Sequence, residues 1–142
     1  MMKDKILVVD ADPFILSIIK TTLESAGYKV YTALDGEIAL EQFHYRRPDL
    51  LIVDIMLPHL SGWEVCRRIR KQSNMPILIH TPVDSPEYRL HASKLGVDQY
   101  LVKPVLPKVL KNQVELTLKP QPTPLPRPVR PLPLAELIAE YA

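Results

Sequence analysis

Short apolar runs, each leading to a polar side chain, recur along this chain. Continuous runs of this kind are typical of strands that are buried on both faces of a parallel sheet. A weaker run, Lys29–Ala33, alternates in character and indicates a fifth strand nearer a sheet edge. The four stronger runs, with the polar residue that each one reaches, are Ile6–Val9 with Asp10, Leu50–Val53 with Asp54, Pro76–Ile79 with Thr81, and Tyr100–Val102 with Lys103.

Helical periodicity fills the intervals between these runs. Asp12 and Pro13 are a typical N-cap and first-turn pair, and the helix that they begin is stopped by Gly27. Alternation of five strands with five helices predicts one α/β domain with a doubly wound parallel sheet, a (βα)5 unit. The four further predicted helices cover residues 36–47, 61–72, 86–95 and 107–118.

Proline divides the chain of 142 residues, because seven of its fifteen prolines lie between Pro120 and Pro133. We predict a domain over residues 1–118 and a proline-rich linker in extended polyproline conformation over 119–133. A short amphipathic helix is predicted over 134–142, from the helical spacing of its apolar side chains. These are Leu134, Leu137, Ile138 and Tyr141.

Charge and cysteine usage exclude several classes of protein. A net charge of only +2 gives no general electrostatic case for direct binding to nucleic acid or to a membrane surface. No apolar run is long enough to span a bilayer. The single cysteine, Cys66, can form no internal disulfide, and its apolar helical position is typical of a core residue. A reduced, cytoplasmic setting is predicted.

The polar residues after the strands predict a single site. Ligands of open α/β sheets bind beyond the carboxyl ends of the strands, where the strand order reverses. Asp10 and Asp54 offer carboxylates for a hard divalent cation. The Thr81 hydroxyl can donate to an anion, and the Lys103 ammonium can neutralise it. Four such residues at one edge indicate anion and metal chemistry rather than four unrelated loop caps.

These segments resemble the receiver domain of two-component response regulators. The resemblance covers residues 5–118 and implies a flavodoxin-like fold with strand order 2-1-3-4-5. It implies a phosphoacceptor that assists its own phosphotransfer, without independent enzymatic turnover. The elements that carry it are Ile6–Asp10, Val53–Pro58 followed by Ser61 and Gly62, Thr81, and Tyr100–Pro104.

The resemblance assigns roles to individual residues. Asp54 matches the phosphoacceptor, which takes a phosphoryl group from a histidine kinase or a phosphotransfer protein. Lys103 matches the lysine that pairs with the phosphoryl group, and the bond from Lys103 to Pro104 is expected to be cis. Thr81 matches the hydroxyl that moves toward the phosphoryl group, and Tyr100 the aromatic residue that swings inward with it.

For Mg²⁺, the resemblance implies Asp10, Asp54 and the main-chain carbonyl of Met56 as ligands. Asp12 can reach the ion through water, but its role as helix N-cap is favoured. The family usually has a second acidic residue after the first strand, and that residue is the direct ligand. This chain has Ala11 there, which offers no oxygen, so we expect a degenerate acidic pocket with weak Mg²⁺ binding.

Two further positions affect the expected chemistry. Pro82 follows Thr81 and has no backbone N–H, where the family commonly donates one to the phosphoryl oxygens. Met56 and Val83 stand at positions that tune hydrolysis in the family, and both are too apolar to position an attacking water. We therefore expect a long-lived phosphate on Asp54.

Three functions stay open from the sequence. A phosphorylatable receiver is favoured over a pseudo-receiver, a protein-binding module that works without phosphorylation. An unrelated flavodoxin-like enzyme or flavin carrier is disfavoured, since the loop after the first strand is acidic where a flavin phosphate needs hydroxyls and glycines. The resemblance also implies a homodimer or partner contact through the face of the fourth helix, fifth strand and fifth helix.

The remaining sequence features are expected to have ordinary structural roles. The four histidines have no spacing that indicates a ligand set, and Gly36 and Gly62 are expected in helix-entry loops. A basic cluster is predicted to be a solvated face that complements the helix C-terminal dipole, with docking to an acidic partner as the alternative. It comprises Arg67, Arg68, Arg70 and Lys71.

Overall fold

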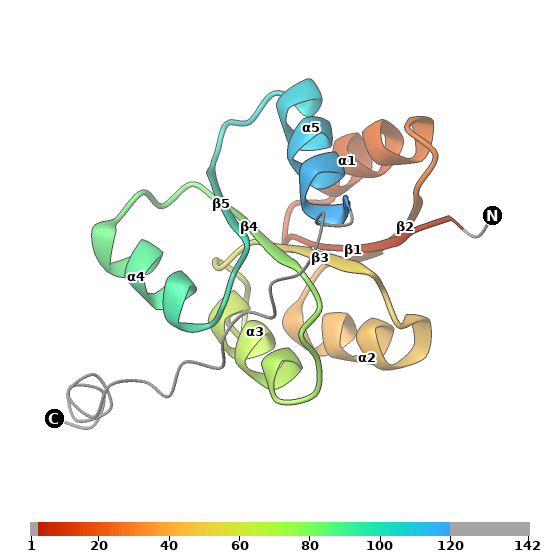
Figure 1. The fold of residues 1–142 in the computed structure, drawn as a ribbon. Coiled ribbons are helices and arrows are strands. Elements are labelled where there is room, and N and C mark those ends of the chain that lie inside the picture. The colour runs from red at the N-terminus through yellow and green to blue at the C-terminus, as the bar shows by residue number, and fades with distance from the viewer. Residues whose placement is uncertain (1–2, 120–142) are drawn as a thin grey trace, which may run out of the picture.

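Five strands and five helices alternate along residues 3–119, the part of the chain that the computed structural model describes (Figure 1). The predicted short helix and all but the first residue of the predicted linker lie outside this part. The elements are β1 (Lys5–Val9), α1 (Pro13–Ser25), β2 (Lys29–Ala33), α2 (Gly36–Arg46), β3 (Leu50–Val53), α3 (Gly62–Arg70), β4 (Ile77–Thr81), α4 (Pro86–Lys94), β5 (Gln99–Val102) and α5 (Pro107–Leu118).

All strands are parallel, and their order is β2-β1-β3-β4-β5. The register places Val9 beside both Ala33 and Val53, so the carboxyl ends of the first three strands are level. The predicted doubly wound sheet and its strand order are confirmed. The predicted edge position of Lys29–Ala33 is also confirmed.

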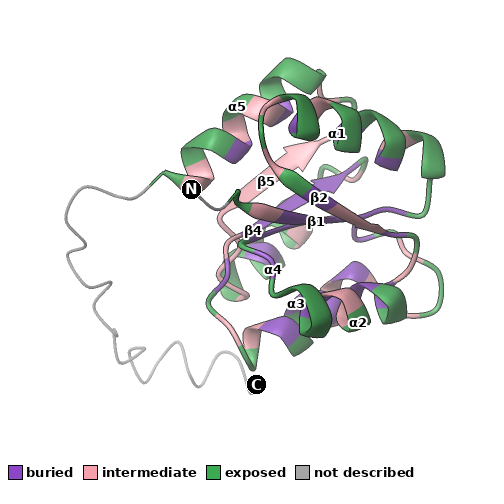
Figure 2. Ribbon diagram, turned by 90° about the vertical axis from the view of Figure 1, so that its right-hand side faces the viewer, coloured by how far each residue is buried: buried purple, intermediate pink, exposed green. Residues whose placement is uncertain are grey.

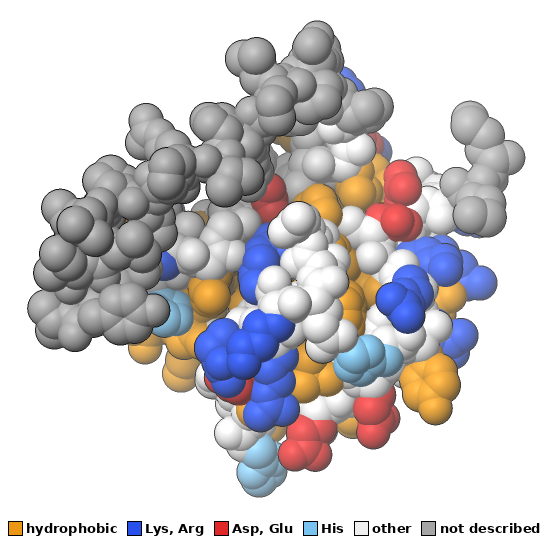
Figure 3. Space-filling model, turned by 60° about the horizontal axis from the view of Figure 1, so that its bottom comes forward, with side chains coloured by type: hydrophobic (Ala, Val, Ile, Leu, Met, Phe, Trp, Pro, Cys, Tyr) orange, Lys and Arg blue, Asp and Glu red, His pale blue; other side chains and the backbone are white. Residues whose placement is uncertain are grey.

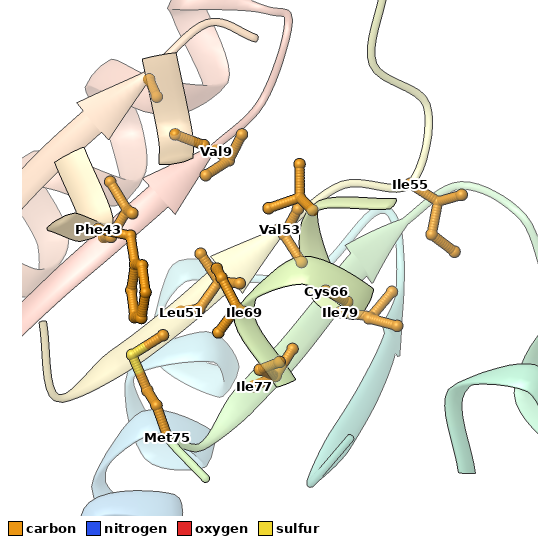
Figure 4. Close-up of a cluster of buried hydrophobic side chains, with 14 of the residues drawn as sticks. Val9, Phe43, Leu51, Val53, Ile55, Cys66, Ile69, Met75, Ile77 and Ile79 are labelled. Carbon is orange, nitrogen blue, oxygen red and sulfur yellow. The ribbon is translucent and has the colours of Figure 1, made fainter. Parts of the chain in front are cut away.

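Helices cover both faces of the sheet, with α1 and α5 on one side and α2, α3 and α4 on the other (Figure 1). Burial is deepest in the central strands, as Figure 2 shows. The core beneath α2 and α3 contains Phe43, Leu51 and Ile77 (Figure 4). Every residue of β5 is only partly buried. The prediction that Tyr100–Val102 is buried on both faces is therefore wrong, because this strand lies at an edge.

Side-chain caps explain where four of the helices begin. Asp12, Asp35, Ser61 and Ser85 each accept a hydrogen bond from a backbone N–H in the first turn of the helix that follows. The helix that starts at Pro107 has no such cap. Within residues 3–119, no helix is both long and apolar enough to cross a membrane.

Arg70 corrects the prediction of a solvated basic face. Its guanidinium donates to the carbonyl oxygens of Leu95 at 2.8 Å and Gly96 at 3.0 Å, and also to that of Met75. It therefore ties α3 to the loop between α4 and β5. The neighbouring Arg67 and Arg68 pair instead with Glu64 on the surface. Lys and Arg side chains form separate groups on the face seen in Figure 3.

Candidate functional site

Backbone hydrogen bonds continue for one residue beyond the ends of β1 and β3. The Asp10 N–H donates to the Ala33 carbonyl at 3.1 Å, and the Asp54 N–H donates to the Val9 carbonyl at 3.0 Å. Both aspartates are thereby fixed at the carboxyl edge of the sheet. The Lys103 N–H donates to the Thr81 carbonyl at 2.8 Å, which places the lysine at the same edge.

One ammonium group joins the two carboxylates. Lys103 Nζ donates to Asp10 Oδ2 at 2.6 Å and to Asp54 Oδ2 at 2.8 Å. Asp10 is 3% exposed and Asp54 is 5% exposed, so the interaction is largely shielded from water. Burial acts to lower the pKa of Lys103, but the hydrogen bonds to both aspartates outweigh it and the pKa is raised. The triad carries one net negative charge.

Thr81 contributes a buried hydroxyl beside this triad in the fold. The residue is fully buried, and among the described residues its Oγ1 has no hydrogen-bond partner. Buried hydroxyl groups are almost always hydrogen-bonded, so an unpartnered one calls for a specific explanation. A group that enters the site and accepts from this hydroxyl would provide one.

Tyr100 contacts the loop between β4 and α4. Its hydroxyl donates to the Val83 carbonyl at 2.6 Å, and the Arg89 guanidinium lies 4.8 Å from the centre of its ring. Burial raises the pKa of Tyr100, so the hydroxyl stays protonated as a donor. These contacts link β5 to the segment between β4 and α4.

Asp12 acts as the helix cap that the sequence favours. Its side chain accepts from the Phe14 N–H at 2.9 Å, while its own N–H donates to Asp10 Oδ1 at 2.9 Å. Ala11 is exposed. The Met56 N–H donates to Asp54 Oδ1 at 2.9 Å, so each Asp54 oxygen has one partner.

The donors fit Mg²⁺ only with substantial help from water. Mg²⁺ commonly keeps several waters and binds through one or two carboxylates. Asp10 and Asp54 supply two carboxylates, and Met56 can add a carbonyl oxygen. Within residues 3–119 no three His, Cys, Asp or Glu side chains are grouped so that they could hold a metal ion.

The loops that follow β4 and β5 agree with the sequence in two respects. Pro82 is exposed directly after Thr81, where no N–H is available for an anion. The peptide bond between Lys103 and Pro104 is cis, as the resemblance implied.

Gly62 has a role that the sequence analysis missed. A Cβ atom on Gly62 would lie 2.2 Å from the carbonyl oxygen of Asp54 and 2.6 Å from Cα of Ile55. The Gly62 N–H also donates to the Ile55 carbonyl at 3.0 Å. The start of α3 is therefore packed against the backbone of Asp54. The Ser61-Gly62 pair within the resemblance was the available signal.

His80 was also missed, because periodicity alone treats it as one residue of a strand. It is 5% exposed, and its Nε2 has no hydrogen-bond partner among the described residues. Burial, followed by the nearby Lys103 charge, lowers the pKa of His80 to about 4. The imidazole is therefore neutral at pH 7.

Known proteins share this fold and much of this sequence. The family model of the response regulator receiver domain matches residues 6–115. The probable transcriptional regulator ycf27 of Guillardia theta is 44% identical over 117 residues, which are 82% of this chain and 46% of that protein. The alkaline phosphatase synthesis transcriptional regulatory protein PhoP of Bacillus subtilis is 41% identical over 119 residues, which are 83% of this chain and 50% of that protein. The chain thus spans about half the length of these curated relatives.

Solved structures agree. Chemotaxis protein CheY4 of Vibrio cholerae superimposes with a TM-score of 0.79 at 35% identity, covering 82% of this chain and all of that one. The BeF3-activated N-terminal receiver domain of Klebsiella pneumoniae RstA gives 0.78 at 32% identity, covering 82% and 100%. With its five parallel strands and level strand ends, this chain belongs to the response regulator receiver domain family.

Proposed function

We propose that Asp54 accepts a phosphoryl group from a histidine kinase or a phosphotransfer protein. Receiver domains are signalling modules that interact with such donors, and this chain belongs to the receiver domain family. The observation that carries the proposal is the Lys103 ammonium, which contacts Asp54 and Asp10 at 2.8 and 2.6 Å. The buried, unpartnered Thr81 hydroxyl supports it, because a phosphoryl oxygen would be its acceptor.

The transfer breaks the P–N bond of a phosphohistidine and forms a P–O bond to an Asp54 carboxylate oxygen. The donor imidazole, protonated at its other nitrogen, leaves in the neutral form. Asp54 then carries two negative charges instead of one, close to buried Asp10. Lys103 neutralises part of this charge without leaving its position. Asp10, Asp54 and the Met56 carbonyl would hold Mg²⁺, which supplies further charge neutralisation when bound.

Under this proposal Thr81 and Tyr100 would transmit the change. Movement of the Thr81 hydroxyl toward the phosphoryl group would vacate space beside β4. Tyr100 would follow by giving up its hydrogen bond to Val83. We assign the output to protein contacts, including a homodimer through α4, β5 and α5. Exposed Leu90 in α4 and Leu116 in α5 support such a contact.

We also propose the division of the chain into a receiver over 1–118, a linker over 119–133 and a short helix over 134–142. Dependence on an ATP-fuelled kinase and a single reduced cysteine support a cytoplasmic location. The chain spans about half of its relatives ycf27 and PhoP, which are named as transcriptional regulators. Any effect on transcription would then require a further domain or a partner.

A pseudo-receiver is the second candidate, and one observation favours it. Lys103 already contacts both buried carboxylates and offsets one of their two charges, so the pocket depends less on a metal ion. Ala11 and Pro82 remove one carboxylate and one backbone donor that would act in phosphotransfer. Each loss amounts to roughly 1–3 kcal/mol, the scale of a hydrogen bond to a charged group.

The experiment that separates the two candidates uses the full chain with a small phosphodonor and Mg²⁺. Intact mass spectrometry measures covalent phosphate, and beryllium fluoride with Mg²⁺ tests formation of the analogue. Trp63 serves as an optical reporter, since its ring lies 4.5 Å from that of His91 and 5.7 Å from that of Tyr88 in α4. Asp54→Asn is the matched control, because it preserves shape and removes the nucleophile.

A phosphate adduct on the wild type, absent from Asp54→Asn, supports the receiver. An absent adduct together with no response to Mg²⁺ supports the pseudo-receiver. Ala11→Asp restores a carboxylate and is expected to tighten Mg²⁺ binding at least tenfold in either case. No gain in affinity would show that position 11 does not face the metal site.

A further inference from the structure

Met56 combines an exposed thioether with a backbone contact to the candidate phosphoacceptor. The residue is 56% exposed, whereas Met75, the other methionine within residues 3–119, is 6% exposed and packs in the core (Figure 4). The Met56 N–H donates to Asp54 Oδ1 at 2.9 Å. A sulfur atom that water can reach is therefore carried by a residue that is bonded to the carboxylate of Asp54.

The backbone around Met56 fixes this arrangement. The carbonyl of Ile55 accepts from the Leu57 N–H and from the Gly62 N–H, both at 3.0 Å. Ile55 itself is buried, so the chain returns to the surface at Met56. A chemical change in the Met56 side chain would consequently take place next to Asp54 and would not require the loop to move.

The exposed surface around the site offers few groups that could orient a water molecule. Among the residues that follow Asp10, Asp54, Thr81 and Lys103 within two positions, the exposed ones are Ala11, Asp12, Met56, Pro82 and Pro104. Asp12 is the only one of these with a charged or strongly polar side chain, and it caps α1 by accepting from the Phe14 N–H. A thioether is a weak acceptor. A phosphoryl group on Asp54 would therefore meet a mostly apolar entrance.

Oxidation converts the thioether into a polar group. With hydrogen peroxide as the oxidant, an S–O bond forms while the O–O bond breaks, the sulfur atom gives up two electrons, and the second oxygen leaves as water. The product, methionine sulfoxide, is polar and chiral at sulfur. Cys66 does not compete for the oxidant, because it is buried and burial raises the pKa of its thiol to about 12.

We propose that Met56 is a peroxide-sensitive modification site, and that its sulfoxide shortens the life of a phosphate on Asp54. This inference rests on the proposed phosphorylation of Asp54 and adds a control over its duration. The sulfoxide oxygen would accept a hydrogen bond from the attacking water and hold it against the phosphorus atom. Reduction of the sulfoxide back to the thioether would restore the slow rate.

The first measurement needs no phosphate. The folded full chain is treated with hydrogen peroxide, the excess is removed with catalase, and peptide mass spectrometry locates each added oxygen. Met56 should be oxidised about tenfold faster than Met75, since susceptibility follows exposure. In urea-unfolded chain the two rates should converge. Equal rates in the folded protein would overturn the assignment of the site.

The second measurement follows the loss of covalent phosphate by intact mass, after loading with a small phosphodonor and Mg²⁺. Oxidised wild type should lose phosphate about two- to tenfold faster than untreated wild type, the scale of one hydrogen bond. Treatment with methionine sulfoxide reductases for both epimers should reverse the gain. Met56→Leu is the matched control, because it retains the other three methionines, and its peroxide-treated and untreated forms should lose phosphate at the same rate.

Equal phosphate lifetimes for oxidised and untreated wild type would overturn the proposal, and so would a peroxide response of the same size in Met56→Leu. Urea denaturation excludes general damage, since oxidation of an exposed side chain should leave the unfolding midpoint unchanged. A lowered midpoint together with a shortened lifetime would also count against the proposal. Absence of covalent phosphate from both forms would refute the proposed role of Asp54 and the link to its phosphate, while the peptide map would still decide whether Met56 is a modification site.

Discussion

At the scale of single residues, Lys103 bridges two carboxylates that water scarcely reaches. Asp10 and Asp54 are both less than 6% exposed, and the ammonium is within hydrogen-bond distance of each. Removing one partner from a buried ion pair usually costs several kcal/mol, because the other charge stays buried. The same lysine therefore stabilises the resting fold and neutralises the phosphoryl group in the proposed reaction.

Met56 is expected to lengthen the life of the phosphorylated state. Its side chain is 56% exposed and offers no hydrogen-bonding group to orient an attacking water. Met56→Gln should shorten the phosphate lifetime about tenfold, equivalent to about 1.4 kcal/mol of barrier. Loss of covalent phosphate over time, followed by intact mass, measures this.

Met56→Leu is the matched control for that series and should keep the slow rate. Phosphate loss from the wild type within seconds would contradict the prediction. Equal rates for the Gln and Leu variants would show that position 56 does not control water.

At the scale of elements, α3 is held against the candidate phosphoacceptor by the close approach of Gly62. Gly62→Ala should destabilise the fold by about 3 kcal/mol, because the new Cβ would overlap the Asp54 carbonyl at 2.2 Å. Gly27 has a φ of 98° but nothing within 4 Å of an added Cβ. Gly27→Ala should therefore cost only about 1 kcal/mol of backbone strain. Chemical unfolding compares the two, and equal losses would contradict the packing argument.

Arg70 joins α3 to the loop before β5, and we expect it to matter more for stability than its charged neighbours. Arg70→Ala removes hydrogen bonds to four backbone carbonyls, those of Ser73, Met75, Leu95 and Gly96, and should cost about 2–4 kcal/mol. Arg68→Ala removes a surface pair with Glu64 and should cost less than about 1 kcal/mol. Urea denaturation of both variants measures the difference, and a similar cost for each would refute the structural role of Arg70.

Strand ends were predictable from the sequence, and contacts between loops were not. Asp10, Asp54 and Lys103 were placed at one edge because parallel strands run in the same direction, so local patterns were sufficient. Gly62 and Arg70 act through backbone that lies close only after folding. No periodicity marks which glycine faces a neighbouring carbonyl, or which arginine of a basic run turns inward. The roles proposed for Thr81 and Tyr100 stay predictions.

At the scale of the whole molecule, buried His80 makes stability depend on pH. Its pKa is lowered from 6.5 to about 4, so the unfolded chain binds a proton more readily than the fold between these values. The contribution of neutral His80 to the stability of the fold is therefore full above pH 6.5 and is lost as the pH falls toward 4. Between pH 7 and pH 4 the free energy of unfolding of the wild type should fall by about 2–3 kcal/mol because of this residue alone.

His80→Leu isolates the effect, since Asp10, Asp54 and Lys103, the charged groups facing His80, remain in place. The loss of unfolding free energy between pH 7 and pH 4 should be smaller in this variant by that amount. His59→Asn, which removes an exposed histidine with a φ of 65°, should keep the wild-type slope. Equal slopes for wild type and His80→Leu would refute the assignment.

The strand order has a consequence for the way the chain is made. With β1 first, β2 adds on one side and β3 on the other, and β4 and β5 then extend the β3 side in turn. Each strand that leaves the ribosome can therefore pair with an exposed edge of the growing sheet, and no strand has to be inserted between two earlier ones. Lys103 follows the last strand. Until it arrives, the nascent sheet holds Asp10 and Asp54 without the ammonium that contacts both, so the candidate site is the final part of the sheet to be completed.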